Sequence, residues 1–326
     1  MKAEDVEKLC TEAAEAGRRL QTALHQRIFG QDEAIEQLVI ALFCGGHVLI
    51  EGAPGLGKTT LVQTLASSVD LTFRRIQFTP DLMPADILGA RVLEPGADGA
   101  RSFRFHPGPI FTHVLLADEL NRATPRTQAA LLEAMAEGQV TSFGDTHPLP
   151  KPFLVAATQN PIEMEGTYPL PEAQLDRFQL QLEIHMPALG ALVQLLEASA
   201  STKAPVQPLM SRESLLQAQA LVREIPISSE LIGRVARLLL ATHPEDAASG
   251  PVARRLLRHG ASPRGGQSLL LAAKARALLQ GRLHVTREDL EKLYFPALRH
   301  RVVAAFGVEP GAATSREALQ EAWSRT

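Results

Sequence analysis

The octapeptide at positions 52–59, Gly-Ala-Pro-Gly-Leu-Gly-Lys-Thr, constrains the fold of this chain more than any other feature. It matches a phosphate-binding loop, in which glycine, four free positions and a second glycine precede lysine and serine or threonine. The glycines let backbone N–H groups curl around a phosphate, and a following helix offers its N-terminal amides to the same anion. The apolar run 47–50 predicts a strand before the loop, and 60–66 predicts a helix after it. This context predicts an α/β domain that binds a nucleoside triphosphate.

The side chains of this loop are expected to take different parts in binding. Lys58 can reach the β- and γ-phosphates, and Thr59 can place its hydroxyl on a magnesium ion. The residues that we expect to contact the nucleotide here are Gly52, Ala53, Pro54, Gly55, Leu56, Gly57, Lys58, Thr59 and Thr60.

Composition narrows the class of protein further. The 326 residues suffice for about two domains, and a hydrophobic fraction of 45% with a net charge of −3 is an ordinary globular balance that gives no bulk attraction to nucleic acids. Cys10 and Cys44 lack a metal-binding or redox spacing, which is typical of a reducing compartment. We find neither the apolar core of a signal peptide nor an apolar run long enough for a membrane, so we expect a cytoplasmic protein without membrane insertion.

Apolar runs alternate with helical patterns through the first part of the chain. The runs that predict strands lie at 47–50, 73–78, 113–117, 153–158 and 178–184, and they predict a five-stranded parallel sheet with helices on both faces. Two turn-rich insertions interrupt this rhythm. The segment 79–109 predicts a helix and a hairpin, and 139–152 predicts a second hairpin.

Beyond Met186 the pattern changes to helices alone. Helical spacing without a convincing strand predicts a smaller all-α domain with helices at 211–224, 228–242, 265–281 and 286–300. We therefore divide the chain into an α/β domain at 1–190, a linker at 191–210 and a helical domain at 211–326.

Polar side chains follow two of the predicted strands. Asp118 and Glu119 follow the strand 113–117, which we expect beside the strand of the phosphate loop. There Asp118 can hold the magnesium shell and Glu119 can polarise an attacking water; the alternative is a pair of solvated acids. Asn160 follows the strand 153–158, where its amide can hydrogen-bond the γ-phosphate or the water; the alternative is a turn-forming Asn-Pro.

Two arginines complete the candidate site. Arg177 precedes the last strand at the rim of the sheet, where it can face a neighbouring subunit and stabilise a transition state there. Arg264 begins a helix of the second domain and is expected to fold back on the nucleotide of its own chain. Glu133 can project into a neighbour's site or be an ordinary solvated charge, and Asn121 has no assigned role.

Several of these segments together resemble one family. They are 45–52, Gly-Gly-His-Val-Leu-Ile-Glu-Gly; 116–123, Leu-Ala-Asp-Glu-Leu-Asn-Arg-Ala; 157–161, Ala-Thr-Gln-Asn-Pro; and 173–178, Ala-Gln-Leu-Asp-Arg-Phe. From about residue 20 to about residue 305 the chain is similar to the MoxR-family AAA+ ATPases. The resemblance implies an AAA+ P-loop α/β domain followed by an all-α lid, with a Walker A motif at 52–59 and a Walker B motif at 114–119.

The resemblance also implies ligands and roles for single residues. The implied ligands are ATP and Mg²⁺, Asn160 matches sensor 1, Arg177 the arginine finger and Arg264 sensor 2. The insertions 79–109 and 139–152 match the helix-2 insert and the hairpin before sensor 1. The place where the family packs adenine matches Ile28, Phe29, Gly30 and Gln31.

The function that the resemblance implies is ATP-driven remodelling, assembly or activation of protein partners. The implied assembly is a homo-oligomeric ring, which we expect to be a hexamer. One partner class that it implies is a protein with a von Willebrand A domain. The alternatives are a nucleic-acid motor and a motor subunit similar to that of magnesium chelatase. The insertions argue against a nucleic-acid partner, because 139–152 carries Lys151 besides His147 and 79–109 carries three arginines, Arg91, Arg101 and Arg104.

Overall fold

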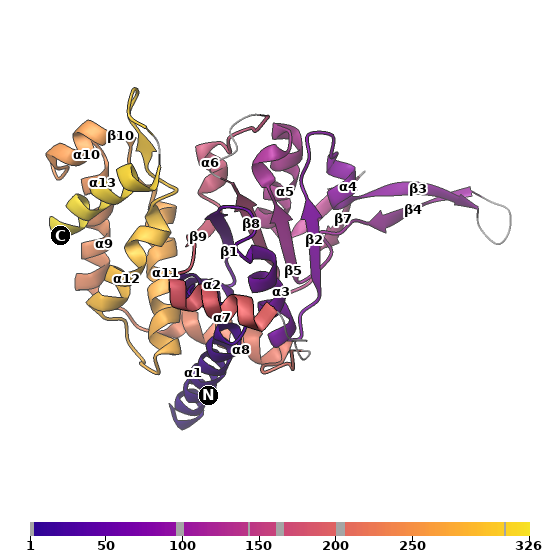
Figure 1. Ribbon diagram of the computed structural model, residues 1–326, viewed down its shortest axis with the longest axis horizontal. Helices are drawn as coiled ribbons and strands as arrows, with labels where there is room; N and C mark the ends of the chain where they lie inside the picture. The colour runs from indigo at the N-terminus through magenta and orange to yellow at the C-terminus, as the bar shows by residue number, and fades with distance from the viewer. Residues whose placement is uncertain (1–2, 96–100, 143, 161–165, 200–205, 310) are drawn as a thin grey trace.

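A five-stranded parallel sheet forms the centre of the first domain in the computed structural model (Figure 1). The structure describes residues 3–95, 101–142, 144–160, 166–199, 206–309 and 311–326. The strands are β1 (His47–Gly52), β2 (Phe73–Gln77), β5 (Val114–Asp118), β8 (Leu154–Gln159) and β9 (Phe178–Ile184). Their order across the sheet is β2-β5-β8-β1-β9, and every pairing is parallel. The prediction of five parallel strands is confirmed.

One expectation about this sheet is wrong. The strand that ends at Asp118, β5, does not lie beside β1, because β8 pairs with both strands and separates them. Val114 is in register with Leu154, and Val48 is in register with Ala156. The order of strands in a sheet is set by the connections between them, and an apolar run in the sequence does not indicate which strands will be neighbours.

Helices cover both faces of the sheet, and successive residues of each strand pack into opposite layers. On β1, Val48 and Ile50 pack into the layer of α1 (Ala3–His25), α2 (Asp32–Cys44) and α3 (Lys58–Ser68). Leu49 points the other way, into the layer of α5 (Pro125–Glu137). Both faces are dry, which explains why the central strands read as continuous apolar runs rather than alternating ones.

The two insertions form hairpins on the side of the sheet away from the lid (Figure 1). The first contains α4 (Pro84–Leu88) and the antiparallel pair β3 (Gly89–Pro95) and β4 (Arg101–Pro107), which projects from the body. The second pairs β6 (Gln139–Ser142) with β7 (Asp145–Pro148). An ion pair between Arg91 and Asp145 joins the hairpins, and the rings of Phe105 and His147 stack at 3.9 Å. Short elements η1 (Leu120–Arg122) and α6 (Glu172–Leu175) follow β5 and precede β9.

In the described residues, the second domain contains helices and one short antiparallel pair of strands. Its helices are α8 (Arg212–Glu224), α9 (Ser229–Thr242), α10 (Pro251–Leu256), α11 (Pro263–Leu279), α12 (Arg287–Leu298) and α13 (Ala312–Ser324). The expectation that no strand follows Met186 is wrong, because β10 (Leu257–His259) pairs with β11 (Val303–Ala304). Strands of two or three residues are too short to produce an alternating pattern.

The segment between the domains also differs from the expected linker at 191–210. Its first part is helix α7 (Leu189–Ser199), and residues 200–205 lie outside the described part of the chain. In the described ranges no helix has the length and apolar character needed to span a bilayer.

The lid packs against β9, the edge strand of the sheet (Figure 1). Arg301 donates from Nε to Asp176 Oδ1 at 2.7 Å and from Nη2 to the carbonyl of Phe178 at 2.6 Å. At the other end of β9, the buried side chain of Arg299 bridges Glu183, at 2.6 Å, and Glu51. Arginines from one short segment of the lid therefore bind residues at both ends of this edge strand.

Candidate functional site

The carboxyl ends of β1, β8 and β5 meet at one edge of the sheet. Because the strands are parallel and in register, the phosphate loop, the acidic pair and Asn160 emerge side by side. Thr158 connects them: its Oγ1 donates to Asp118 Oδ1 at 2.6 Å and accepts from the backbone N–H of Glu119 at 2.9 Å. Sequence reasoning overlooked Thr158, although a hydroxyl at the polar end of a buried strand was a usable signal.

The phosphate loop has the backbone that its glycines permit. Gly55 and Gly57 have φ values of 82° and 84°, in the left-handed region that side chains other than glycine's rarely adopt. Gly57 directly precedes the first turn of α3, so the N-terminal amides of that helix face the loop. Lys58 Nζ donates to the carbonyl of Gly52 at 2.6 Å, which holds the lysine over the loop. This cradle suits a phosphate group.

A mostly apolar cavity of about 170 Å³ adjoins the loop. Ile28, Phe29 and Gln31 line it, and the loop contributes Gly55, Leu56, Gly57 and Thr60. Four further lining residues, which sequence reasoning missed, come from the segment after β9: Met186, Pro187, Leu192 and Leu195. Leu192 and Leu195 have helical spacing, but they lie in the segment interpreted as linker. Three of the four residues predicted to pack adenine therefore share this cavity with the phosphate loop, whereas Gly30 lines a different cavity.

The two acidic residues are held by side chains that the motifs did not indicate. Arg75, on β2, donates from Nε and Nη2 to Asp118 Oδ2 at 3.0 and 2.6 Å. Gln77 Nε2 donates to Glu119 Oε2 at 2.7 Å, and Arg122 Nη1 donates to the same oxygen at 2.8 Å. Glu119 itself has a left-handed backbone with φ 57°, an uncommon conformation for a residue other than glycine. A weak signal was present, since polar residues at 75 and 77 alternate at the end of a strand.

The donor set at this edge fits magnesium. Mg²⁺ prefers oxygen ligands and is usually bound through one or two protein side chains together with phosphate oxygens and water. Asp118 and Thr59 supply a carboxylate and a hydroxyl beside the phosphate loop. In the described part of the chain, no group of three or more His, Cys, Asp or Glu side chains could hold a metal by itself.

Both candidate arginines lie near the amino end of β9, whereas the phosphate loop lies at the carboxyl ends of the strands. Arg177 precedes β9 and donates to the carbonyl of Leu132 in α5. Arg264 Nη1 is 4.0 Å from Asp176 Oδ2, and 59% of its side chain is exposed. Since Ile184, at the other end of β9, is paired with Gly52, a strand of seven residues separates them from the loop, roughly 20 Å at ~3.3 Å per residue.

The expectation that Arg264 folds back on its own nucleotide is therefore not met. The lid covers the edge of β9, and Ser262 Oγ and Arg301 Nε, at 3.0 and 2.7 Å from Asp176 Oδ1, fix the start of α11 at the wrong end of that strand. The sequence signal for the start of a helix does not indicate which end of a strand that helix will pack against.

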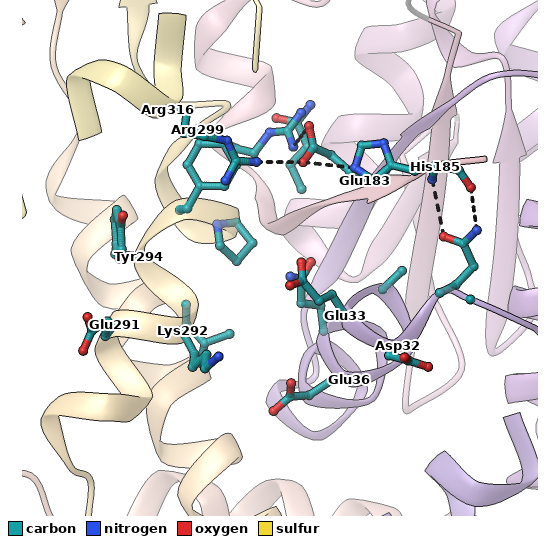
Figure 2. Close-up of a pocket in the computed structure, with 18 residues that line it drawn as sticks. Asp32, Glu33, Glu36, Glu183, His185, Glu291, Lys292, Tyr294, Arg299 and Arg316 are labelled. Carbon is teal, nitrogen blue, oxygen red and sulfur yellow. Dashed lines mark hydrogen bonds and ion pairs between the residues drawn. The ribbon is translucent and has the colours of Figure 1, made fainter. Parts of the chain in front are cut away.

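A second, more polar cavity of about 420 Å³ lies between α2, β9 and α12 (Figure 2). Gln31 separates it from the apolar cavity, because this residue lines both. The Gln31 amide donates to the carbonyl of His185 at 2.6 Å and accepts from its N–H at 3.4 Å. Glu183 and Arg299 form a further wall. Gly30 and Gln31, which were predicted to pack adenine, line this cavity, and no motif indicated its other residues.

Together, the parallel sheet, the phosphate loop and the helical lid define a nucleotide-binding ATPase of the AAA class. Residues 47–180 match the model of the ATPase family associated with various cellular activities, and residues 252–322 match an AAA lid domain. The chain superposes with a TM-score of 0.89 and 33% identity on a solved candidate ATPase from Cytophaga hutchinsonii, covering 100% of this chain and 98% of the other.

Curated relatives narrow the class further. The chain is 41% identical to Chaperone MoxR1 of Mycobacterium tuberculosis over 86% of this chain and 73% of the relative. It is 32% identical to Protein MoxR of Methylorubrum extorquens over 90% and 89% of the two chains. The protein belongs to the MoxR family of AAA ATPases.

Proposed function

We propose that the protein hydrolyses ATP in a magnesium-dependent reaction at the edge where β1, β8 and β5 end. The observation that carries the proposal is the convergence of the phosphate loop, Asp118-Glu119 and Asn160 at that edge. Thr59 and Asp118 would hold the magnesium ion, which would supply positive charge to the phosphate oxygens when bound. Lys58 turns from the Gly52 carbonyl to the phosphates, and the loop amides bind them from below.

Glu119 is the base in this proposal, and Asn160 orients the attacking water. The Glu119 carboxylate accepts hydrogen bonds from Gln77 and Arg122, so it must exchange at least one of these donors for the water that it polarises. The adenine enters the apolar cavity, where Ile28 and Phe29 face the base and Gly30 and Gln31 form the adjoining wall. The mostly apolar lining of this cavity supports that assignment.

A homo-oligomeric ring follows from the positions of the arginines. Arg177 and Arg264 lie roughly 20 Å from the loop of their own chain, at the opposite edge of the sheet, so the nucleotide that they serve belongs to a neighbour. A head-to-tail contact of this kind forms a ring when the rotation between subunits closes, and we propose that it closes as a hexamer. Arg177 supplies the finger, and Arg264 joins it from the same face.

The proposed work of the ring is to remodel, assemble or activate protein partners. The name of the chaperone relative supports this class of function. The two joined hairpins project away from the nucleotide edge and the lid, where a client or a partner with a von Willebrand A domain can reach them (Figure 1). Coupled hairpins can pass a movement at the client to the sheet as one unit.

Two substitutions test the hydrolytic proposal by separating binding from chemistry. Glu119→Gln keeps a neutral hydrogen-bonding side chain, so ATP should bind with nearly unchanged affinity while hydrolysis falls by about 100-fold or more. Lys58→Ala removes the cation from the loop, and nucleotide binding itself should be lost. Binding by a fluorescent ATP analogue and phosphate release are measured for both variants. Wild-type turnover in Glu119→Gln would remove this residue from the mechanism.

A further inference from the structure

The edge strand β2 directs a cation at the acidic pair. Arg75 and Gln77 are two residues apart and therefore share one face of the strand. The guanidinium of Arg75 places two nitrogens, at 3.0 and 2.6 Å, on one oxygen of Asp118. The Asp118 side chain is 11% exposed and that of Arg75 is 47% exposed. An arginine therefore reaches in from the solvent to a carboxylate that is almost enclosed.

Both oxygens of this carboxylate already have partners. Oδ1 accepts from Thr158, and Oδ2 accepts from Arg75. A nearly buried carboxylate is costly without a positive or hydrogen-donating partner, and Arg75 supplies the positive charge. Two nitrogens of the guanidinium take up the lone pairs of Oδ2, so magnesium or its bound water could bind this oxygen only after Arg75 leaves it. The two cations therefore compete for Asp118.

We propose that Arg75 is an internal counter-ion of Asp118 that magnesium displaces when nucleotide binds. The proposal rests on the magnesium-dependent reaction proposed above. Without metal, Arg75 neutralises the carboxylate and keeps Asp118 in place at the end of β5. When the metal takes Oδ2, the guanidinium swings into solvent, which its long stem and present exposure allow. Arg75 thereby sets the magnesium concentration at which the nucleotide site fills.

The same guanidinium is connected to the second acid. Arg75 Nη2 also donates to Gln77 Oε1 at 2.8 Å, and the amide of Gln77 donates to Glu119 Oε2. One arginine thus contacts Asp118 directly and Glu119 through a single amide. Its departure removes the hydrogen bond that orients Gln77, so occupation of the metal site loosens the hold on the proposed base.

The test is a magnesium titration of nucleotide binding with ADP, in which no turnover occurs. Arg75→Met keeps an unbranched side-chain stem and removes the charged end. The magnesium concentration for half-maximal binding of a fluorescent ADP analogue should fall by about fivefold, since a partly exposed ion pair contributes modestly. Arg75→Lys keeps the charge without the two-pronged contact and should fall between wild type and Arg75→Met. The matched control is Arg74→Met, on the opposite face of β2 and exposed; it should bind as wild type does.

Thermal unfolding gives a second readout. Without metal and nucleotide, Arg75→Met should melt lower than wild type, because Asp118 then lacks its counter-ion; saturating magnesium and ADP should close the gap. An unchanged magnesium requirement overturns the proposal. A raised requirement also overturns it, because Arg75 would then hold Asp118 in position for the metal. If wild type itself shows no magnesium-dependent nucleotide binding, the proposed function fails, and the result differs from either of these.

Discussion

Single glycines around the phosphate loop show two different reasons for the same residue type. A Cβ on Gly52 would lie 2.7 Å from the carbonyl oxygen of Ile184, so this position is closed by the neighbouring strand. A Cβ on Gly57 would meet nothing within 4 Å, but its φ of 84° is strained for any side chain. The first glycine serves the packing of the sheet, and the second serves the curvature of the loop.

The two substitutions should therefore fail in different assays. Gly52→Ala should lower the free energy of unfolding by about 2 kcal/mol through overpacking against β9. Gly57→Ala should leave the fold nearly as stable, because the loop can relax without nucleotide, but should weaken nucleotide binding about tenfold, since binding restores a strained backbone. Chemical denaturation and nucleotide titration measure the two effects. Equal stability losses in both variants would contradict this division.

At the level of elements, the side chain of His47 on β1 forms hydrogen bonds to both β8 and α5. Its Nδ1 accepts the N–H of Val155 on β8 at 3.0 Å, so its Nε2 carries the proton and donates to the carbonyl of Met135 at the end of α5, at 3.2 Å. Burial lowers the pKa of His47 to about 4. The neutral ring is needed, because a proton on Nδ1 would break the bond to β8.

This pKa shift has a definite sign for stability. The unfolded chain binds a proton at His47 near pH 6.5, whereas the folded protein does so only near pH 4. The contribution of His47 is therefore present above pH 6.5 and is lost as the pH falls toward 4, by about 2 kcal/mol for a partly buried ring. His47→Gln can make both hydrogen bonds without titrating, so its stability should fall less over that range. Denaturant unfolding at pH 7, 5.5 and 4.5 measures the free energy of unfolding of both proteins. An equal loss of stability with falling pH in wild type and His47→Gln would refute the role given to His47.

Elements with local signals were predicted well from the sequence. The helices predicted at 211–224 and 228–242 are α8 (Arg212–Glu224) and α9 (Ser229–Thr242), and in each the serine before the helix caps its first turn. The misses depended on distant contacts. The position of β8 between β5 and β1, and the pairing of β10 with β11, are set by elements far away in the sequence.

The candidate site shows the same division. Its loop residues follow from motifs with fixed spacing, whereas Arg75 and Thr158 belong to it only because β2 and β8 flank β5. A motif names residues that are close in the chain. Sheet order supplies the others.

For the whole molecule, the separation of the loop from Arg177 predicts complementation. Arg177→Ala and Glu119→Gln should each be inactive alone, and mixing them should restore part of the ATPase activity, because some interfaces then pair an intact Glu119 with an intact Arg177. Activity per chain is measured against mixing ratio and total concentration. Mixtures that stay as inactive as the separate variants would contradict a finger supplied by a neighbour.

The opposite placement of loop and arginines also affects incomplete assemblies. Under the proposed completion of each loop by a neighbour's arginines, a row of chains has a direction and ends in one loop that no neighbour completes. An open arc has one fewer competent site than it has subunits. Only closure of the row engages the last site, and turnover per subunit then reports whether the circle is complete.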